Sequence, residues 1–285
     1  MDHDRNLRLF LECCRERNIK LNVVKLKLRR QEVPYIGHLL TAEGLRADPE
    51  KVRAITEMPA PTDIKGVQRL VGMVNYLSKF YKHLSDDCEP LRQLTHRDSL
   101  WEWTDVQEDA FTRLKEKLTQ VPVLKYYSPE EELTLQCDAS ETGLGAALTQ
   151  HGKPVAFASR ALTLTERGYA QIEKECLAIV FGMEKFHQYT YGRLVRVQSD
   201  HKPLENVIKK PLLLAPKRLQ RMLLRLQKYD ITITYVPGRD MLLADTDCEV
   251  YRENKIKQLL QPNRAGGLKL CYRAKPEGLL SCGFT

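Results

Sequence analysis

Apolar and polar residues alternate along residues 133–138, LTLQCD. Successive side chains of a strand point to opposite sides, so Leu133, Leu135 and Cys137 share one face and Asp138 lies on the other. Asp138 ends this predicted strand, and small residues and glycines follow it. A carboxylate in this position is either solvated or held for chemistry.

Similar patterning continues toward the C-terminus. It predicts strands near 145–149 and 155–162, a helix over about 170–187, a strand over 194–200, a basic helix near 217–229, a strand over 231–236 and a helix from about 244. Three antiparallel strands followed by alternating helices and strands form a mixed sheet with helices packed on it. We therefore expect an α/β protein of the α+β type, with a five-stranded sheet and flanking helices.

The N-terminal half has mainly helical spacing. Apolar residues in 7–14 recur as in an amphipathic helix, and residues 33–52 have the pattern of a hairpin that runs into a turn. Residues 63–95 and 103–120 are spaced like helices, and acids stand near the start of the second one. We expect these two segments to form a small helical bundle.

Composition adds a bias toward polyanionic partners. Lys and Arg total 45 against 37 Asp and Glu, a formal net charge of +8, which favours such partners without proving one. The eight cysteines form no CxxC pair and follow no secretory segment, so we expect free thiols in a reducing compartment. No apolar run approaches the ~20 residues that cross a bilayer, so we expect an intracellular protein without a membrane partner.

Four acids stand at positions that favour a metal site: Asp138, Glu175, Asp200 and Asp245. Asp200 ends a predicted strand as Asp138 does, and Glu175 shares its helix face with apolar residues that should face the sheet. Burying several carboxylates together is costly unless cations neutralise them, and Mg²⁺ or Mn²⁺ suits oxygen ligands. Glu173 lies roughly 200° around the helix from Glu175, so we choose Glu175. Without HExxH or a Cys/His cluster, zinc is not expected.

The motifs around these acids carry a family resemblance. The segments QCDASETGLGAAL, IEKECLAIV, VQSDHKPL and MLLADT resemble the ribonuclease H domain of gypsy-type LTR retrotransposon polyproteins, and the likeness covers nearly all of residues 130–246. Upstream, residues 18–52 resemble the end of the reverse transcriptase palm, with a primer-grip hairpin around Tyr35 to Leu40. Residues 66–95 resemble its thumb.

This resemblance implies a ribonuclease H-like fold and a nuclease. Asp138, Glu175, Asp200 and Asp245 match the family's four metal-binding acids. They would hold two ions, Mg²⁺ or Mn²⁺, and cut the RNA strand of an RNA–DNA hybrid. The implied domains are a palm remnant at 1–58, a thumb-like unit at 59–128, the ribonuclease H-like domain at 129–255 and a loose tail at 256–285.

The resemblance also has gaps. The Tyr-x-Asp-Asp turn of a polymerase is absent, so polymerase activity is not expected from this chain alone. Asp86 and Asp87 form the only Asp-Asp pair, which we interpret as a solvated helix end. The family's Leu-Ser-Arg ending after ADT is replaced by Asp247, Cys248 and Glu249, which could loosen Asp245. Two alternatives therefore stay open: an inactive nucleic-acid-binding remnant, and a polymerase accessory piece that acts with another subunit.

The predicted basic helix offers a nucleic-acid surface. Arg218, Arg221, Arg225 and Lys228 recur at spacings of three and four, which places them in one stripe beside an apolar stripe. Lys209, Lys210 and Lys217 extend the positive region. Such a stripe would hold phosphates with little base specificity, and the alternative is a solvated charged face.

Overall fold

The structure of the chain is a computed structural model that describes residues 2–28, 30–96, 99–209, 212–238 and 241. Asp245, Lys210, the helix expected from about residue 244 and the tail at 256–285 lie outside the described residues. The backbone of Lys209 is described but its side chain is not. Within the described part, no helix combines the length and apolar character needed to cross a membrane.

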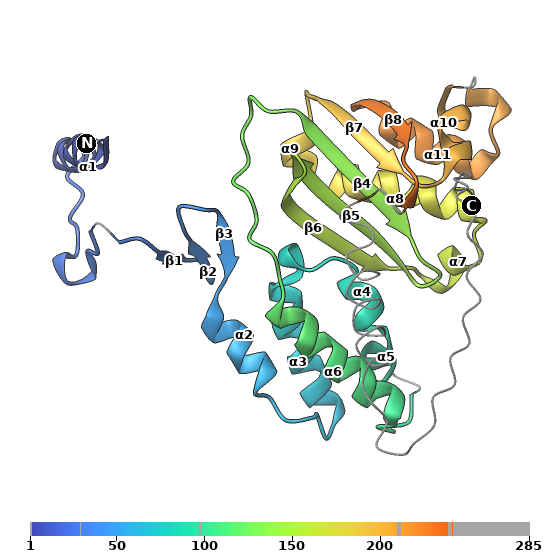
Figure 1. The fold of residues 1–285 in the computed structure, drawn as a ribbon, viewed down its shortest axis with the longest axis horizontal. Coiled ribbons are helices and arrows are strands. Elements are labelled where there is room, and N and C mark those ends of the chain that lie inside the picture. The colour runs from blue at the N-terminus through green and yellow to red at the C-terminus, as the bar shows by residue number, and fades with distance from the viewer. Residues whose placement is uncertain (1, 29, 97–98, 210–211, 239–240, 242–285) are drawn as a thin grey trace, which may run out of the picture. The chain divides into compact units, whose positions relative to one another are not determined.

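A five-stranded mixed sheet forms the C-terminal half, in the order β6-β5-β4-β7-β8 (Figure 1). Its strands are β4 (Leu133–Ala139), β5 (Gly143–Gln150), β6 (Lys153–Ala161), β7 (Leu194–Ser199) and β8 (Asp230–Tyr235). The first three are antiparallel, whereas β7 is parallel to β4 and β8 is parallel to β7. The predicted fold class is confirmed, and the alternation in β4 buries the three residues expected to face the core.

Helix α8 (Gln171–Lys185) packs on β4 and β5, and α11 (Lys217–Leu226) packs on α8. Close packing depends on Gly182, where an added Cβ would lie 3.1 Å from the Cβ of Ala146 and from Sγ of Cys137. The shorter helices here are α7 (Leu164–Arg167), α9 (His187–Thr190), α10 (Lys202–Lys209) and η3 (Leu212–Leu214). One apolar core joins the sheet, α8 and α11.

The N-terminal segment contains α1 (Asp2–Glu16), the short η1 (Val23–Lys25) and a three-stranded antiparallel sheet. Its strands are β1 (Val33–Tyr35), β2 (His38–Leu40) and β3 (Leu45–Ala47), and α2 (Pro49–Thr56) follows. The sequence predicted only a hairpin and a turn here. Strand β3 pairs with β2, and its Leu45 also pairs with the distant Leu124. Helix α2 begins where the Asp48 side chain accepts a hydrogen bond from the backbone N–H of Glu50.

The helical bundle contains α3 (Ile64–Tyr76), η2 (Ser78–Phe80), α4 (Leu84–Asp87), α5 (Glu89–Gln93) and α6 (Asp105–Thr119). The helix predicted over 103–120 is confirmed, and the segment 63–95 is broken into shorter helices. The bundle core includes Ala147 and Phe157 of the sheet. Since Ala146 contacts α8 and strand residues alternate, the bundle covers the opposite face of the sheet.

The prediction of a solvated Asp86–Asp87 pair was wrong. Asp87 is buried, and its Oδ2 accepts hydrogen bonds from the Tyr81 hydroxyl at 2.7 Å and from Lys117 Nζ at 3.1 Å. Asp86 is partly buried because α4 packs against β5 and β6. The pair is a structural feature of the bundle, with no strand–turn–strand around it.

Candidate functional site

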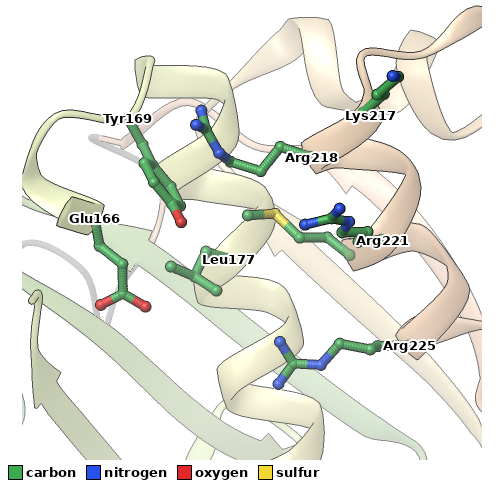
Figure 2. A pocket seen from close by; sticks show the side chains of 8 residues that line it. Glu166, Tyr169, Leu177, Lys217, Arg218, Arg221 and Arg225 are labelled. Carbon is green, nitrogen blue, oxygen red and sulfur yellow. The ribbon is translucent and has the colours of Figure 1, made fainter.

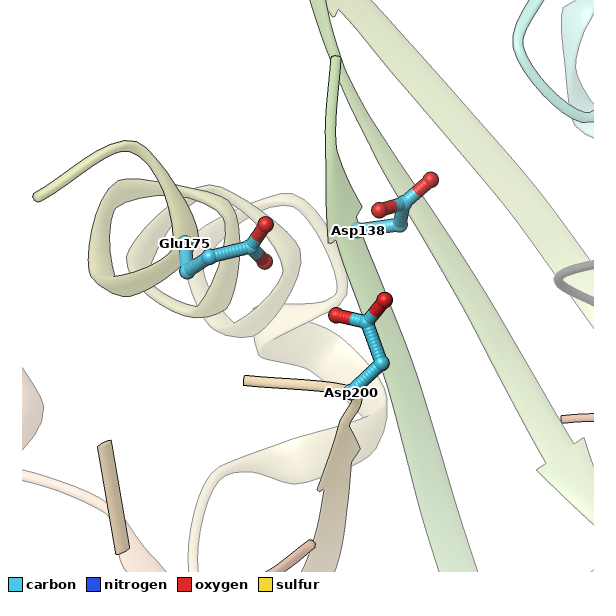
Figure 3. A group of neighbouring side chains, drawn as sticks. All are labelled: Asp138, Glu175 and Asp200. Atoms are coloured by element: carbon cyan, nitrogen blue, oxygen red, sulfur yellow. The ribbon is translucent and has the colours of Figure 1, made fainter. Parts of the chain in front are cut away.

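Three of the four predicted acids converge at one end of the sheet. Oxygens of Asp138, Glu175 and Asp200 all lie within 4.8 Å of one another (Figure 3). Strands β4 and β7 are parallel neighbours, so Asp138, the penultimate residue of β4, and Asp200, which directly follows β7, meet at the same edge. Helix α8 directs Glu175 toward both of them.

Burial and neighbouring carboxylates disfavour the charged forms of Glu175 and Asp138. Burial raises the pKa of Glu175 to about 8, and the nearby Asp138 and Asp200 carboxylates add to the effect. Burial also raises the pKa of Asp138, with Lys82 opposing the shift and Asp200 reinforcing it. Nearby cations would reverse these shifts, because they favour the charged carboxylates.

Glu175 also has one oxygen positioned for a ligand. Its Oε1 accepts a hydrogen bond from Gln171 Nε2 at 2.7 Å. Its Oε2 is buried and has no hydrogen-bond partner among the described residues. A buried carboxylate oxygen without a partner is costly, and a divalent ion bound by oxygen ligands would satisfy it. The residues present therefore fit a hard divalent cation.

Glu173 lies away from this cluster, as the helical rotation predicted, but it is not solvated. It is 9% exposed, and its Oε2 accepts hydrogen bonds from the backbone N–H of Ala170 at 3.0 Å and from Arg218 Nη1 at 2.7 Å. Glu173 thus stabilises the first turn of α8 and holds α11 against it.

The predicted basic stripe on α11 is largely paired with acids of α8. Arg218 bonds Glu173 and stacks 4.1 Å from the centre of the Tyr169 ring. Arg225 donates to both carboxylate oxygens of Glu184, with Nε 3.0 Å from Oε1. Lys228 Nζ lies 3.8 Å from the same Oε1. These contacts fix α11 to α8, a structural role that the spacing could not show.

Arg221 and Lys217 make no ion pair within the described part of the chain. Both line an open cavity of about 380 Å³ between α7, α8 and α11, together with Glu166, Tyr169 and two further arginines (Figure 2). Arg221 reaches from α11 toward this cavity. It is therefore the arginine of the stripe best placed to meet a phosphate.

One neighbour of the cluster was not predicted. His83 Nε2, at the start of α4, lies 3.6 Å from Asp138 Oδ2. No local pattern could reveal this contact, since it depends on packing between the bundle and the sheet.

Comparison with known proteins finds a family match over part of the chain. The family profile "RNase H-like domain found in reverse transcriptase" matches residues 103–197. The chain carries an RNase H-like domain of reverse transcriptases. The resemblance predicted from the sequence is thereby confirmed.

Curated relatives match most of the chain. It is 34% identical over 259 residues to the retrovirus-related Pol polyprotein from transposon opus of Drosophila melanogaster, covering 85% of this chain and 26% of that protein. The polyprotein from transposon gypsy of the same species is 30% identical over 257 residues, covering 86% of this chain and 25% of the relative. The Tf2-3 polyprotein of Schizosaccharomyces pombe is 27% identical, and the match covers 89% of this chain and 20% of that polyprotein. The chain thus spans about a quarter of the first two relatives' length.

Solved structures support the fold. The foamy viral protease-reverse transcriptase in complex with an RNA/DNA hybrid aligns with a TM-score of 0.71 at 21% identity, covering 98% of this chain and 36% of that one. A form of the same viral protein in complex with double-stranded DNA aligns with a TM-score of 0.63 at 24% identity. This alignment covers 73% of this chain and 38% of the viral chain. These likenesses establish the shared architecture of the RNase H-like domain and the elements before it.

Proposed function

We propose that this chain is a metal-dependent endoribonuclease that cuts the RNA strand of RNA–DNA hybrids. The observation that carries the proposal is the convergence of Asp138, Glu175 and Asp200 at the edge of an RNase H-like sheet, with a buried oxygen of Glu175 left without a described partner. The hybrid named for the foamy viral structure supports this substrate class.

Each acid has a proposed role. Asp138 and Glu175, with Asp200 at the exposed side of the cluster, hold the metal, and Asp245 is proposed as the fourth ligand. Two bound Mg²⁺ or Mn²⁺ ions would activate a water and stabilise the leaving 3′ oxygen. The protein contributes by holding Asp138 on a strand, Glu175 on a helix and Asp200 directly after a strand, so that the three carboxylates are close together before the substrate arrives.

The hybrid is proposed to lie along α11. Arg221 and Lys217 contact its phosphates, because the other described cations of the stripe already bind acids of α8. Lys209 and Lys210 remain proposed contacts as well. Recognition then depends on backbone geometry and the 2′-hydroxyl groups rather than on base sequence.

The alternative is an inactive nucleic-acid-binding remnant. The replacement of the family's Leu-Ser-Arg ending by Asp247, Cys248 and Glu249 favours this alternative, since it changes the residues next to Asp245.

Substrate choice tests the proposal. Purified protein is incubated with an end-labelled RNA–DNA hybrid, duplex RNA or duplex DNA, in Mg²⁺, in Mn²⁺ or in EDTA. We expect cleavage of the RNA strand of the hybrid alone, and only with a divalent ion. Hybrid binding without any cleavage in either metal would support the inactive remnant instead.

A further inference from the structure

His83 occupies an unusual backbone position beside the carboxylate cluster. It occupies the N-cap position of α4 with φ 53° and ψ 23°, a left-handed conformation that is uncommon for residues other than glycine and asparagine. The conformation directs the ring onto Gly145, where an added Cβ would lie 2.6 Å from the imidazole Cε1. Gly145 is the cross-strand partner of Asp138, so the missing side chain on β5 leaves room for the ring beside that acid.

The ring lies between two carboxylates. Its Nε2 is 3.6 Å from Asp138 Oδ2 and its Nδ1 is 3.8 Å from Asp86 Oδ2, while the His83 side chain is only 16% exposed. Both distances slightly exceed hydrogen-bond length. Such contacts are commonly long before a ligand binds.

Asp86 is itself held in place by hydrogen bonds from the β4–β5 turn. Its Oδ1 accepts hydrogen bonds from Ser140 Oγ at 3.1 Å and from Thr142 Oγ1 at 3.0 Å, both in the turn that follows Asp138. Gly143 makes room for this carboxylate, because a Cβ there would overlap the same oxygen. A row of neighbouring polar groups therefore runs from the β4–β5 turn through Asp86 and His83 to Asp138, with separations of 3.8 and 3.6 Å on the two sides of the ring.

We propose that His83 is a positioning residue for Asp138. It orients the Asp138 carboxylate for the metal from the side opposite Glu175. The inference rests on the proposed metal site and extends it beyond the family match at residues 103–197, because His83 belongs to the helical bundle. Outer partners that orient metal-binding side chains commonly change metal affinity about 10–100-fold when they are removed.

A packing role alone would also explain a ring over Gly145, so the test must separate positioning from packing. His83→Asn keeps a residue that tolerates the left-handed backbone but is too short to reach Asp138. His83→Gln restores an N–H donor near the position of Nε2. His151→Asn is the matched control. His151 lies in the β5–β6 turn, also has a positive φ of 51°, and places its Nε2 3.5 Å from Oε2 of Glu131.

The measurements are the Mn²⁺ dissociation constant by titration calorimetry, the Mg²⁺ concentration for half-maximal cleavage, and KM for the hybrid. For His83→Asn we expect Mn²⁺ affinity to fall about tenfold, with a parallel rise in the Mg²⁺ requirement and an unchanged KM. His83→Gln should recover most of the affinity, and His151→Asn should match the wild type. Thermal unfolding of each variant establishes that it is folded.

The outcomes separate the two proposals. If the wild type and folded His83→Asn bind Mn²⁺ equally well, the role of His83 is overturned and the proposed metal site stands. A wild type that binds no Mn²⁺ overturns both. If His83→Asn does not fold, His83→Gly takes its place, because glycine adopts the left-handed backbone freely and removes the ring. About tenfold weaker Mn²⁺ binding by folded His83→Gly supports the role of His83, and wild-type affinity contradicts it.

Discussion

At the scale of single residues, the carboxylates of the candidate site are placed by elements that the rest of the core already fixes. Asp138 lies on β4, Glu175 lies on α8, and Asp200 is the residue directly after β7. Each side chain therefore loses little conformational entropy on binding a metal, and a change in one acid should leave the others in place.

Glu175 gives the apo protein a characteristic pH dependence. Its pKa rises from 4.5 to about 8 on folding, so between these values the folded state holds a proton that the unfolded state has lost. The contribution of Glu175 to the free energy of unfolding in EDTA should therefore be highest below pH ~4.5 and should fall as the pH rises toward ~8. Melting temperatures across this range measure the effect.

Two comparisons check the assignment to Glu175. Glu175→Gln should flatten the slope, and Mg²⁺ or Mn²⁺ should raise the melting temperature more at the alkaline end, where the carboxylate is charged. An unchanged slope in Glu175→Gln would assign the pH dependence to other groups.

Glu173→Gln should leave metal-dependent cleavage close to wild type, because Glu173 faces Arg218 rather than the cluster. Loss of this partly exposed ion pair should cost no more than about 1 kcal/mol, a few degrees in melting temperature. Parallel cleavage and melting assays on Glu173→Gln and Glu175→Gln measure the difference. Equal loss of cleavage in both variants would contradict the separation of their roles.

At the scale of elements, α11 is attached to α8 by ion pairs, and we propose that its remaining cations bind nucleic acid. Arg221→Glu should weaken hybrid binding and reduce its salt dependence, because each phosphate that a cation neutralises contributes about 0.9 to the log–log slope on B-form duplex. The melting temperature should stay near wild type because Arg221 makes no ion pair among the described residues. Filter binding over a salt series provides the slope.

Arg225→Glu is the matched variant on the same helix. It breaks the two hydrogen bonds to Glu184 and places like charges together, so we expect a lower melting temperature, with a smaller loss of hybrid binding than in Arg221→Glu. If Arg221→Glu left affinity and salt slope unchanged, this face of α11 would be only a solvated surface.

The elements also show what the sequence could predict. The alternation that buries Leu133, Leu135 and Cys137 is local, and it placed β4 correctly, with Asp138 one residue before its end. The rotation between Glu173 and Glu175 is also local. The ion pair of Asp87 with Lys117, the pairing of Arg225 with Glu184 and the approach of His83 to Asp138 depend on partners far away in the chain. Spacing within one element carries no information about them.

At the scale of the described molecule, the helical bundle and the mixed sheet share apolar packing. Phe157 of β6 is 6% exposed and belongs to the bundle core, and Ser85 N–H donates to Ser159 Oγ at 3.0 Å. Phe157→Ala should therefore destabilise both parts, by about 3–5 kcal/mol, with coincident loss of sheet and bundle signals in urea. Two separate transitions, only one of them shifted, would show that the parts unfold independently.

The central claim is that the carboxylate cluster binds the divalent ions needed for cleavage of the RNA strand. Asp138→Asn tests this claim most directly. The amide keeps the shape of the side chain but removes the charge that holds divalent ions against their mutual repulsion. The control is Asp230→Asn, an exposed acid at the opposite end of the sheet. Gel-resolved cleavage of a labelled hybrid in Mg²⁺ and Mn²⁺ is measured beside hybrid binding in EDTA. We expect Asp138→Asn to lose cleavage with binding equal or slightly stronger, and Asp230→Asn to behave as wild type; an Asp138→Asn protein that cuts at the wild-type rate would contradict the claim.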